Sequence, residues 1–155
     1  MKRKTGGKRR RINIRAKGIA GELEAIAFLR GLGFQTSDRL IQPRGGAKDG
    51  PDFYVEHGAQ RMPAISIEVK RAKAVRPWTK GMGSAMRQAL NTPCEVPTAV
   101  MFRRNREPWG FCCTVRIGEA PPTTVVSYGD QIGNLIQMFC PSIERTAQTA
   151  VEGAP

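Results

Sequence analysis

The sequence lacks most of the features that mark membrane, secreted and zinc-binding proteins. No run of about 18 consecutive apolar residues is present, and no apolar segment follows the basic N-terminus, so we expect neither a membrane span nor a secretory signal. The four cysteines form no CxxC pair and His57 is the single histidine, which leaves too few patterned ligands for structural zinc and argues against a histidine-based triad. We therefore expect a cytoplasmic protein with no membrane contact.

Acidic residues are missing from the first 17 positions, which contain nine basic residues. The rest of the chain holds 16 basic and 13 acidic residues, so most of the formal net charge of +12 belongs to this N-terminal arm. A cationic arm binds polyanions by releasing counterions, and nucleic acid is the commonest such partner. The alternative is a solvated tail that contacts nothing of consequence.

The length of 155 residues suits one domain with a modest core. We expect a basic flexible arm over 1–16, a single domain over 17–140 and a flexible tail over 141–155. Apolar periodicity and turn residues predict helices over 17–32, 79–91 and 128–139, and strands over 34–41, 52–56, 64–71, 98–103 and 110–117. Adjacent Cys112 and Cys113 should face opposite sides of a strand and pack. The element order predicts a mixed α/β domain with a hairpin-rich sheet.

The residues with the clearest chemical potential are Asp52, Glu68 and Lys70. Residues two apart on a strand share a face, so Glu68 and Lys70 should point the same way. A turn midway between the two predicted strands puts Asp52 opposite about Val69, within reach of both. Two neighbouring carboxylates favour a hard cation such as Mg²⁺, and a nearby lysine can orient water and stabilise charge on a phosphate. The plainer alternative is a solvated Glu-x-Lys charge pair.

The first predicted helix contributes a third carboxylate. At about 100° per residue, its bulky apolar side chains point in a direction close to Glu22, whereas Glu24 points the opposite way, toward solvent. A glutamate on an apolar face is costly to bury without a partner, which favours Glu22 as a metal or water ligand. The alternative is a glutamate that interacts with the positive helix end.

A second cationic stretch without an acid follows the Glu-x-Lys strand, and a substrate backbone should lie along it. Its members are Lys70, Arg71, Lys73, Arg76, Lys80 and Arg87.

Together, these residues resemble a known nuclease pattern. Glu22, Pro51-Asp52 and Glu68-Val69-Lys70 match the PD-(D/E)XK motif. Over about residues 17–117, the flanking segments resemble the archaeal-type Holliday-junction resolvases, notably in Lys17-Gly18-x-x-x-Glu22 and Trp109-Gly110-Phe111. The chain departs from those resolvases at Leu23, where a basic residue is common, and in its longer basic arm.

The resemblance implies a restriction-endonuclease-like α/β fold, with a central mixed sheet of about five strands flanked by helices. It also implies a homodimeric endonuclease that cuts four-way DNA junctions with Mg²⁺, for which Mn²⁺ can substitute. Carried over by position, Glu22, Asp52, Glu68 and the main-chain carbonyl of Val69 would hold the metal, and Lys70 would serve the attacking water.

The resolvases also have a loop arginine, which would correspond to Arg39 or, as we prefer, Arg44. Including that residue, the expected DNA-binding set is Arg9, Arg10, Arg11, Arg15, Arg44, Arg71, Lys73 and Lys80. Two alternatives remain: a nuclease of the same type that acts on other DNA structures, and a non-catalytic nucleic-acid-binding protein that depends on its arm.

Overall fold

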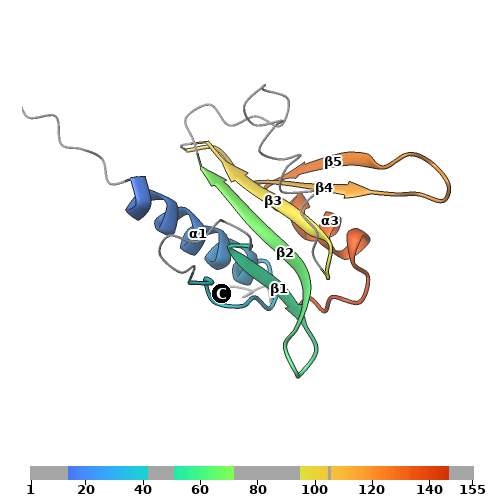
Figure 1. Ribbon diagram of the computed structural model, residues 1–155, viewed down its shortest axis with the longest axis horizontal. Helices are drawn as coiled ribbons and strands as arrows, with labels where there is room; N and C mark the ends of the chain where they lie inside the picture. Colours follow the sequence, from blue (N-terminus) through green and yellow to red (C-terminus); the bar gives the residue numbers. More distant parts are fainter. Residues whose placement is uncertain (1–13, 42–50, 72–94, 105, 147–155) are drawn as a thin grey trace, which may run out of the picture.

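The computed structural model describes residues 14–41, 51–71, 95–104 and 106–146, and side chains from residue 16 onward. Its elements are α1 (Ile14–Gly31), β1 (Phe53–His57), β2 (Met62–Arg71), β3 (Thr98–Arg103), β4 (Gly110–Val115), β5 (Thr123–Tyr128) and α3 (Gln131–Phe139). The five strands form one sheet in the order β1-β2-β3-β4-β5 (Figure 1). The predicted helix over 79–91 lies outside the described residues.

The sheet is mixed because β2 and β3 run parallel, whereas the other neighbouring strands are antiparallel. A parallel pair needs a crossover rather than a tight hairpin, which explains the long segment between Arg71 and Thr98. The two strands consequently end at the same edge of the sheet, where Arg71 pairs with Arg103 (Figure 1). This edge brings the end of the Glu-x-Lys strand next to the end of β3.

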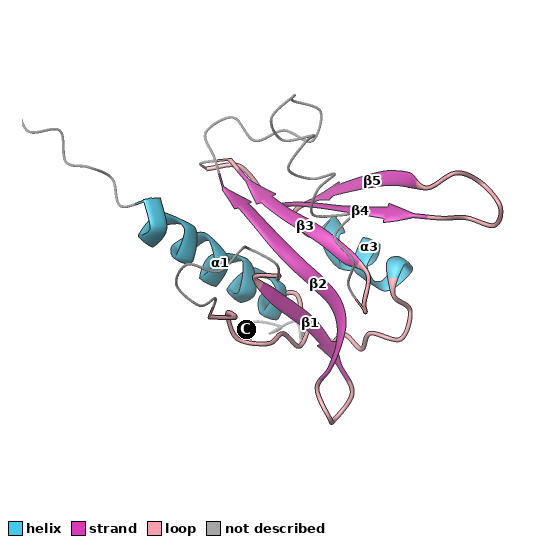
Figure 2. Cartoon of the chain, in the orientation of Figure 1, coloured by secondary structure: helices cyan, strands magenta, loops and turns pink. Residues whose placement is uncertain are grey.

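Both described helices pack on one face of the sheet, and Figure 2 shows them on the same side of the strands. The apolar side chains of α1 and α3 form one core with alternate residues of the strands, including Leu29, Ile67, Met101, Cys113 and Ile136. A smaller buried cluster lies on the other face and consists of Val100, Phe102 and Cys112. Cys113 belongs to the larger core and Cys112 to the smaller cluster, which confirms that the two adjacent cysteines face opposite sides of the sheet. Burial raises the pKa of the Cys112 thiol to about 11 and that of Cys113 to about 12.

The prediction of one α/β domain with a mixed five-stranded sheet is confirmed, but one strand differs from the predicted set. Residues 34–41 form isolated bridges, Phe34 with Arg145 and Thr36 with Val55, rather than a strand of the sheet. The fifth strand is instead β5, whose Thr123–Tyr128 side chains are exposed or half-buried and give a weak apolar pattern. Local pairing with β4 fixes this strand.

The predicted flexible tail begins too early. Ile143 is buried, the Nε atom of Arg145 donates a 2.6 Å hydrogen bond to the carbonyl of Leu32, and the N–H of Thr146 donates to the carbonyl of Gly33. Gly33 has a φ of +93°, and a Cβ at this position would collide with the backbone of Thr146. Residues 141–146 are therefore part of the domain because they close over the end of α1.

Candidate active site

Backbone hydrogen bonds on both sides fix Asp52 at the start of β1. Its N–H donates to the carbonyl of Ile67 on β2 at 2.8 Å, and its own carbonyl accepts from the N–H of Leu40 at 2.9 Å. Its side-chain Oδ2 accepts a 2.7 Å hydrogen bond from the N–H of Val69. Residues 34–41, although they are not a strand, thus help to hold Asp52 against the edge of β2.

The strand register differs by one residue from the prediction. Phe53 pairs with Ile67. When this antiparallel register is continued by one residue, Asp52 lies opposite Glu68 rather than Val69. The predicted turn was placed at the midpoint of the connection, whereas the pairing shifts at an irregularity between Val55 and Glu56. The shift leaves Asp52 beside the Glu-x-Lys segment, as the prediction required.

Glu68 and Lys70 lie on one face of β2, as predicted, and form an ion pair of 2.6 Å between Oε1 and Nζ. Both side chains are largely covered, at 23% and 32% exposed. Glu22 approaches from α1 and is 18% exposed, and its Oε2 lies 3.4 Å from Nη1 of Arg39. Arg39, the less preferred of the two loop-arginine candidates, therefore contacts the site, whereas Arg44 lies outside the described residues.

The charges of the other three candidate catalytic residues all act on the Asp52 carboxyl. Burial is the main cause that raises the pKa of the Asp52 carboxyl from 3.8 to about 7, and the negative charges of Glu68 and Glu22 raise it further. The hydrogen bond from Val69 and the positive charge of Lys70 oppose this rise. Asp52 thus lies in a negative potential that a cation or a proton would relieve.

These residues fit a hard divalent cation in donor chemistry, because the charges of Glu68 and Glu22 both act on the Asp52 carboxyl and the side chains of Glu22 and Glu68 are largely covered. In the described part of the chain, no three His, Cys, Asp or Glu side chains are placed so that they could hold one ion together. The Lys70 ammonium lies against Glu68 and the Arg39 guanidinium against Glu22, and two of the candidate ligands therefore already have cationic partners.

Glu24 was predicted to point into solvent, but it contacts two arginines. One of its oxygens lies 2.7 Å from Nη1 of Arg71 and the other lies 3.5 Å from Nη1 of Arg103. Helix geometry correctly separated Glu22 from Glu24, but it could not show that the ends of β2 and β3 extend past this side of α1. Arg71, an expected DNA-binding residue, therefore has an acidic partner on α1.

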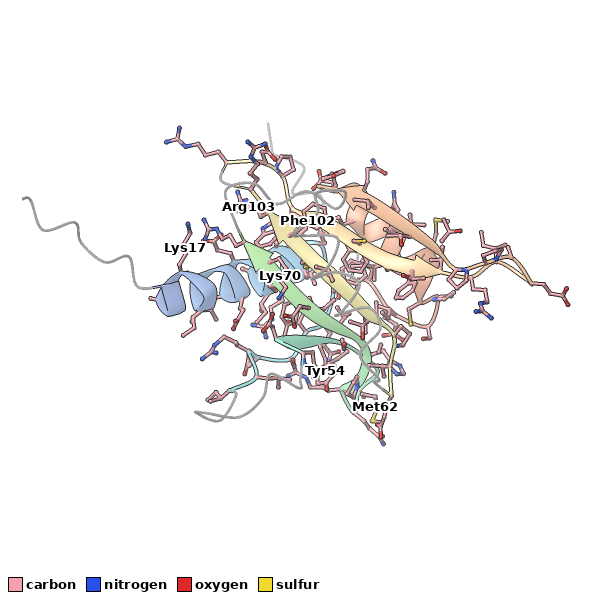
Figure 3. The ribbon with its side chains drawn as sticks, turned by 45° about the horizontal axis from the view of Figure 1, so that its top comes forward. Lys17, Tyr54, Met62, Lys70, Phe102 and Arg103 are labelled. Carbon is pink, nitrogen blue, oxygen red and sulfur yellow. The ribbon has the colours of Figure 1, made fainter. Side chains whose placement is uncertain are left out.

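The remaining expected DNA-binding residues are not placed by the described structure. Arg9, Arg10, Arg11, Arg44, Lys73 and Lys80 lie outside the described residues, and Arg15 lies in α1 without a described side chain. The sequence analysis did not single out Arg103, although β3 ends there and Figure 3 shows it at the same edge of the sheet as Lys70. Its position depends on the parallel pairing of β2 with β3, which is not evident from local sequence.

Three comparisons with known proteins gave no relative: no family model, no curated protein and no solved structure matches the chain. Among the described residues, no helix is long and apolar enough to cross a membrane.

Proposed function

We propose that the protein is a divalent-metal-dependent endodeoxyribonuclease of the PD-(D/E)XK type, with a restriction-endonuclease-like fold. The observation that carries this proposal is the neighbourhood of Asp52, which contains the charges of Glu22, Glu68 and Lys70. These four side chains come from α1, the start of β1 and β2. A solvated charge pair would not require a buried aspartate beside it.

In this proposal, Asp52 and Glu68 would hold Mg²⁺ or Mn²⁺ together with the main-chain carbonyl of Val69, and Glu22 would act through a bound water rather than directly. The bound cation supplies Lewis-acid chemistry that stabilises charge developing on the phosphate. The hydrogen bond from the Val69 N–H orients the Asp52 carboxylate toward the site. Repulsion among the carboxylates favours cation binding at neutral pH, where Asp52 is close to its pKa of about 7.

Lys70 positions the water that attacks the phosphodiester. Its ammonium donates to Glu68 at 2.6 Å and keeps other N–H groups for the water and for a phosphate oxygen. The water oxygen forms a new bond to phosphorus and releases a proton to solvent, one bridging P–O bond breaks, and the leaving sugar oxygen takes up a proton from solvent. Removing the lysine should therefore impair cleavage more than binding.

The substrate proposed from the resemblance is branched DNA, with the four-way junction first. The basic arm and the arginines at the ends of β2 and β3 provide cationic surface for a DNA backbone. A two-fold symmetric junction is most simply cut by two equivalent sites, so we propose a homodimer. Size-exclusion chromatography with light scattering should give about twice the chain mass of 17.0 kDa, and a monomer during turnover would contradict the dimer.

The test compares cleavage of a four-way junction, a flap and a linear duplex by the full chain in Mg²⁺. Asp52→Asn and Lys70→Met should each reduce cleavage by more than about 100-fold, beyond the effect usual for residues outside the ligand shell. Binding of the same DNA in Ca²⁺ should remain within a few fold. Asp38→Asn is the matched control, since the Asp38 side chain is 95% exposed and pairs with Arg30 rather than with a site residue. Undiminished cleavage by both site variants would overturn the assignment.

The second candidate is a nucleic-acid-binding protein without catalysis, which the cationic arm favours. It predicts salt-dependent binding that is indifferent to Mg²⁺, with no cleavage by the wild-type chain in Mg²⁺ or Mn²⁺. Deletion of residues 2–11 separates the two candidates, because a nuclease should keep weak cleavage whereas an arm-dependent binder should lose its activity.

A further inference from the structure

A groove of about 370 Å³ lies beside α1, on the opposite side of the helix from Glu22. Its walls are mostly apolar and come from Ala27 and Phe28 on α1 and from Pro108 and Trp109 before β4. Glu24 and Arg103 add one charge of each sign. The proposed metal site does not use this groove.

Three groups surround Arg103 at the groove, two from the connection between β3 and β4 and one from α1. Its Nε donates a 2.9 Å hydrogen bond to the carbonyl of Glu107, and its guanidinium carbon lies 5.6 Å from the centre of the Trp109 ring. Its Nη1 lies 3.5 Å from Oε2 of Glu24, a distance that is too long for a strong hydrogen bond. The guanidinium is thus oriented but not fully neutralised, which suits it to an anionic group that enters the groove.

One oxygen of the Glu24 carboxylate, Oε2, faces the Arg103 guanidinium at 3.5 Å but accepts no hydrogen bond from a described residue. This oxygen is buried, while the other oxygen accepts from Arg71 at 2.7 Å. Most buried polar atoms are hydrogen-bonded, and an orphaned carboxylate oxygen at the edge of a groove is a place for a donor to bind. The groove therefore combines a flat apolar wall, an acceptor and a cation.

We infer that this groove binds one unpaired nucleotide of the DNA substrate, an inference that depends on the proposed nuclease function. The Phe28 ring, tilted by 37° to the Trp109 ring at 6.4 Å between centroids, provides an aromatic wall for a base, and stacking tolerates any base because each has a π-face. Glu24 accepts a hydrogen bond from an amino group of the base, and Arg103 binds its phosphate. A fully paired base cannot enter, so the preferred substrate contains an unpaired nucleotide, as at a branch point.

The position of the groove fits a strand that also passes the metal site. Arg71 directly follows Lys70 on β2 and pairs with Arg103 on β3, and neighbouring strands lie about 4.8 Å apart. Figure 3 shows Lys70 and Arg103 at the same edge of the sheet, with Lys17 of α1 on the same side of the molecule. Lys70 pairs with Phe102 and so faces away from α1, whereas Arg103 faces α1, and one DNA strand would therefore pass around this end of the sheet to have one phosphate at Lys70 and a nucleotide further along in the groove.

The experiment measures fluorescence anisotropy of two labelled duplexes, identical except for one unpaired nucleotide, in Ca²⁺ so that binding occurs without turnover. The wild-type chain should bind the duplex with the unpaired nucleotide about tenfold more tightly, in the range measured for one base stacked on an aromatic side chain. Ala27→Leu, which fills the groove from an exposed helix position, should bring the ratio of the two affinities close to one. Its affinity for the fully paired duplex should stay unchanged.

Ala20→Leu is the matched control, since Ala20 is exposed on the same helix and does not line the groove, and it should keep the wild-type ratio. Equal affinities for the two duplexes in the wild type, or a ratio that survives Ala27→Leu, would overturn the inference while leaving the nuclease proposal intact. Failure of the wild type to bind or cut any DNA would instead overturn the proposed function. Thermal melting of each variant shows that a change in the ratio does not arise from unfolding.

Discussion

The Oδ2 atom of Asp52 accepts a 2.7 Å hydrogen bond from the N–H of Val69, the residue between Glu68 and Lys70. This contact couples the start of β1 to the part of β2 that holds the other two predicted site residues. It exists because β1 begins only at Phe53, which leaves the N–H of Val69 without a strand partner on that edge. The aspartate side chain takes the place of the missing backbone acceptor, and its carboxylate is thereby oriented.

The burial of Asp52 predicts a pH-dependent change in stability. Because the pKa of its carboxyl is about 7 in the folded chain against 3.8 without burial, the folded state binds more protons between these two values. The stability from this group is full below about pH 4 and is lost as the pH rises through about 7. Asp52→Asn keeps an acceptor for Val69 without the charge, and it should raise the free energy of unfolding at pH 8 by about 1 to 3 kcal/mol.

Urea denaturation in EDTA at several pH values measures this effect. The gain from Asp52→Asn should shrink as the pH falls and disappear near pH 4, whereas exposed Asp38→Asn should stay within about 0.5 kcal/mol of wild type throughout. A gain that is independent of pH would show that Asp52 is not held in a negative potential.

Divalent cations should stabilise the wild-type chain at pH 8. Binding to the folded state alone, at a concentration about 100 times the dissociation constant, should raise the Tm by about 5 to 10 °C for a chain of this size. Glu68→Gln should lose most of this rise because it removes one charged ligand, while Glu119→Gln on the exposed loop after β4 should keep it. Differential scanning fluorimetry with MgCl₂ or MnCl₂ against NaCl of equal ionic strength makes the comparison. An equal rise in both variants would place the bound ion elsewhere.

Part of the placement of the four candidate catalytic residues could be predicted from the sequence, because it follows from local rules. Strand alternation places Glu68 with Lys70, and helix periodicity directs Glu22 toward the apolar side of α1. Strand pairing brings Asp52 to the same place even though the predicted register was one residue off. A motif spread over three elements tolerates such an error, since each side chain reaches several ångströms.

The surroundings of these residues were harder to predict because they depend on non-local pairing. The parallel alignment of β2 with β3 brings Arg103 close to Arg71 and Glu24. No short-range sequence pattern predicts which strand pairs in parallel with β2. Residues 34–41 have an apolar pattern like that of a strand, yet they bind β1 only at scattered points, including the N–H of Leu40 to the carbonyl of Asp52. Tertiary contacts thus override local propensity here.

The closure of α1 by the C-terminal segment should contribute measurable stability. Arg145 donates to the carbonyl of Leu32 at 2.6 Å, and its guanidinium carbon lies 5.6 Å from the centre of the Phe34 ring. Arg145→Ala would leave a helix-end carbonyl without its donor, so the free energy of unfolding should fall by about 1 to 3 kcal/mol. Exposed Arg116→Ala serves as the control in urea denaturation and should change it by less than about 0.5 kcal/mol. If both variants behave alike, residues 141–146 do not hold the domain together.

Gly110 at the start of β4 should not tolerate a side chain. A Cβ at this position would collide with the Phe102 ring, which is buried and packs edge-on against Tyr128 at 5.8 Å. Gly110→Ala should therefore lower the free energy of unfolding by about 1 to 3 kcal/mol, the usual cost of overfilling a packed site. Gly31→Ala is the control, because nothing lies within 4 Å of the added methyl group and alanine favours the helix. In the double variant Gly110→Ala with Phe102→Val, the loss in free energy of unfolding should be smaller than the sum of the losses in the two single variants, because the smaller side chain relieves the collision. Additive losses in urea denaturation would show that the ring and the added methyl group do not meet.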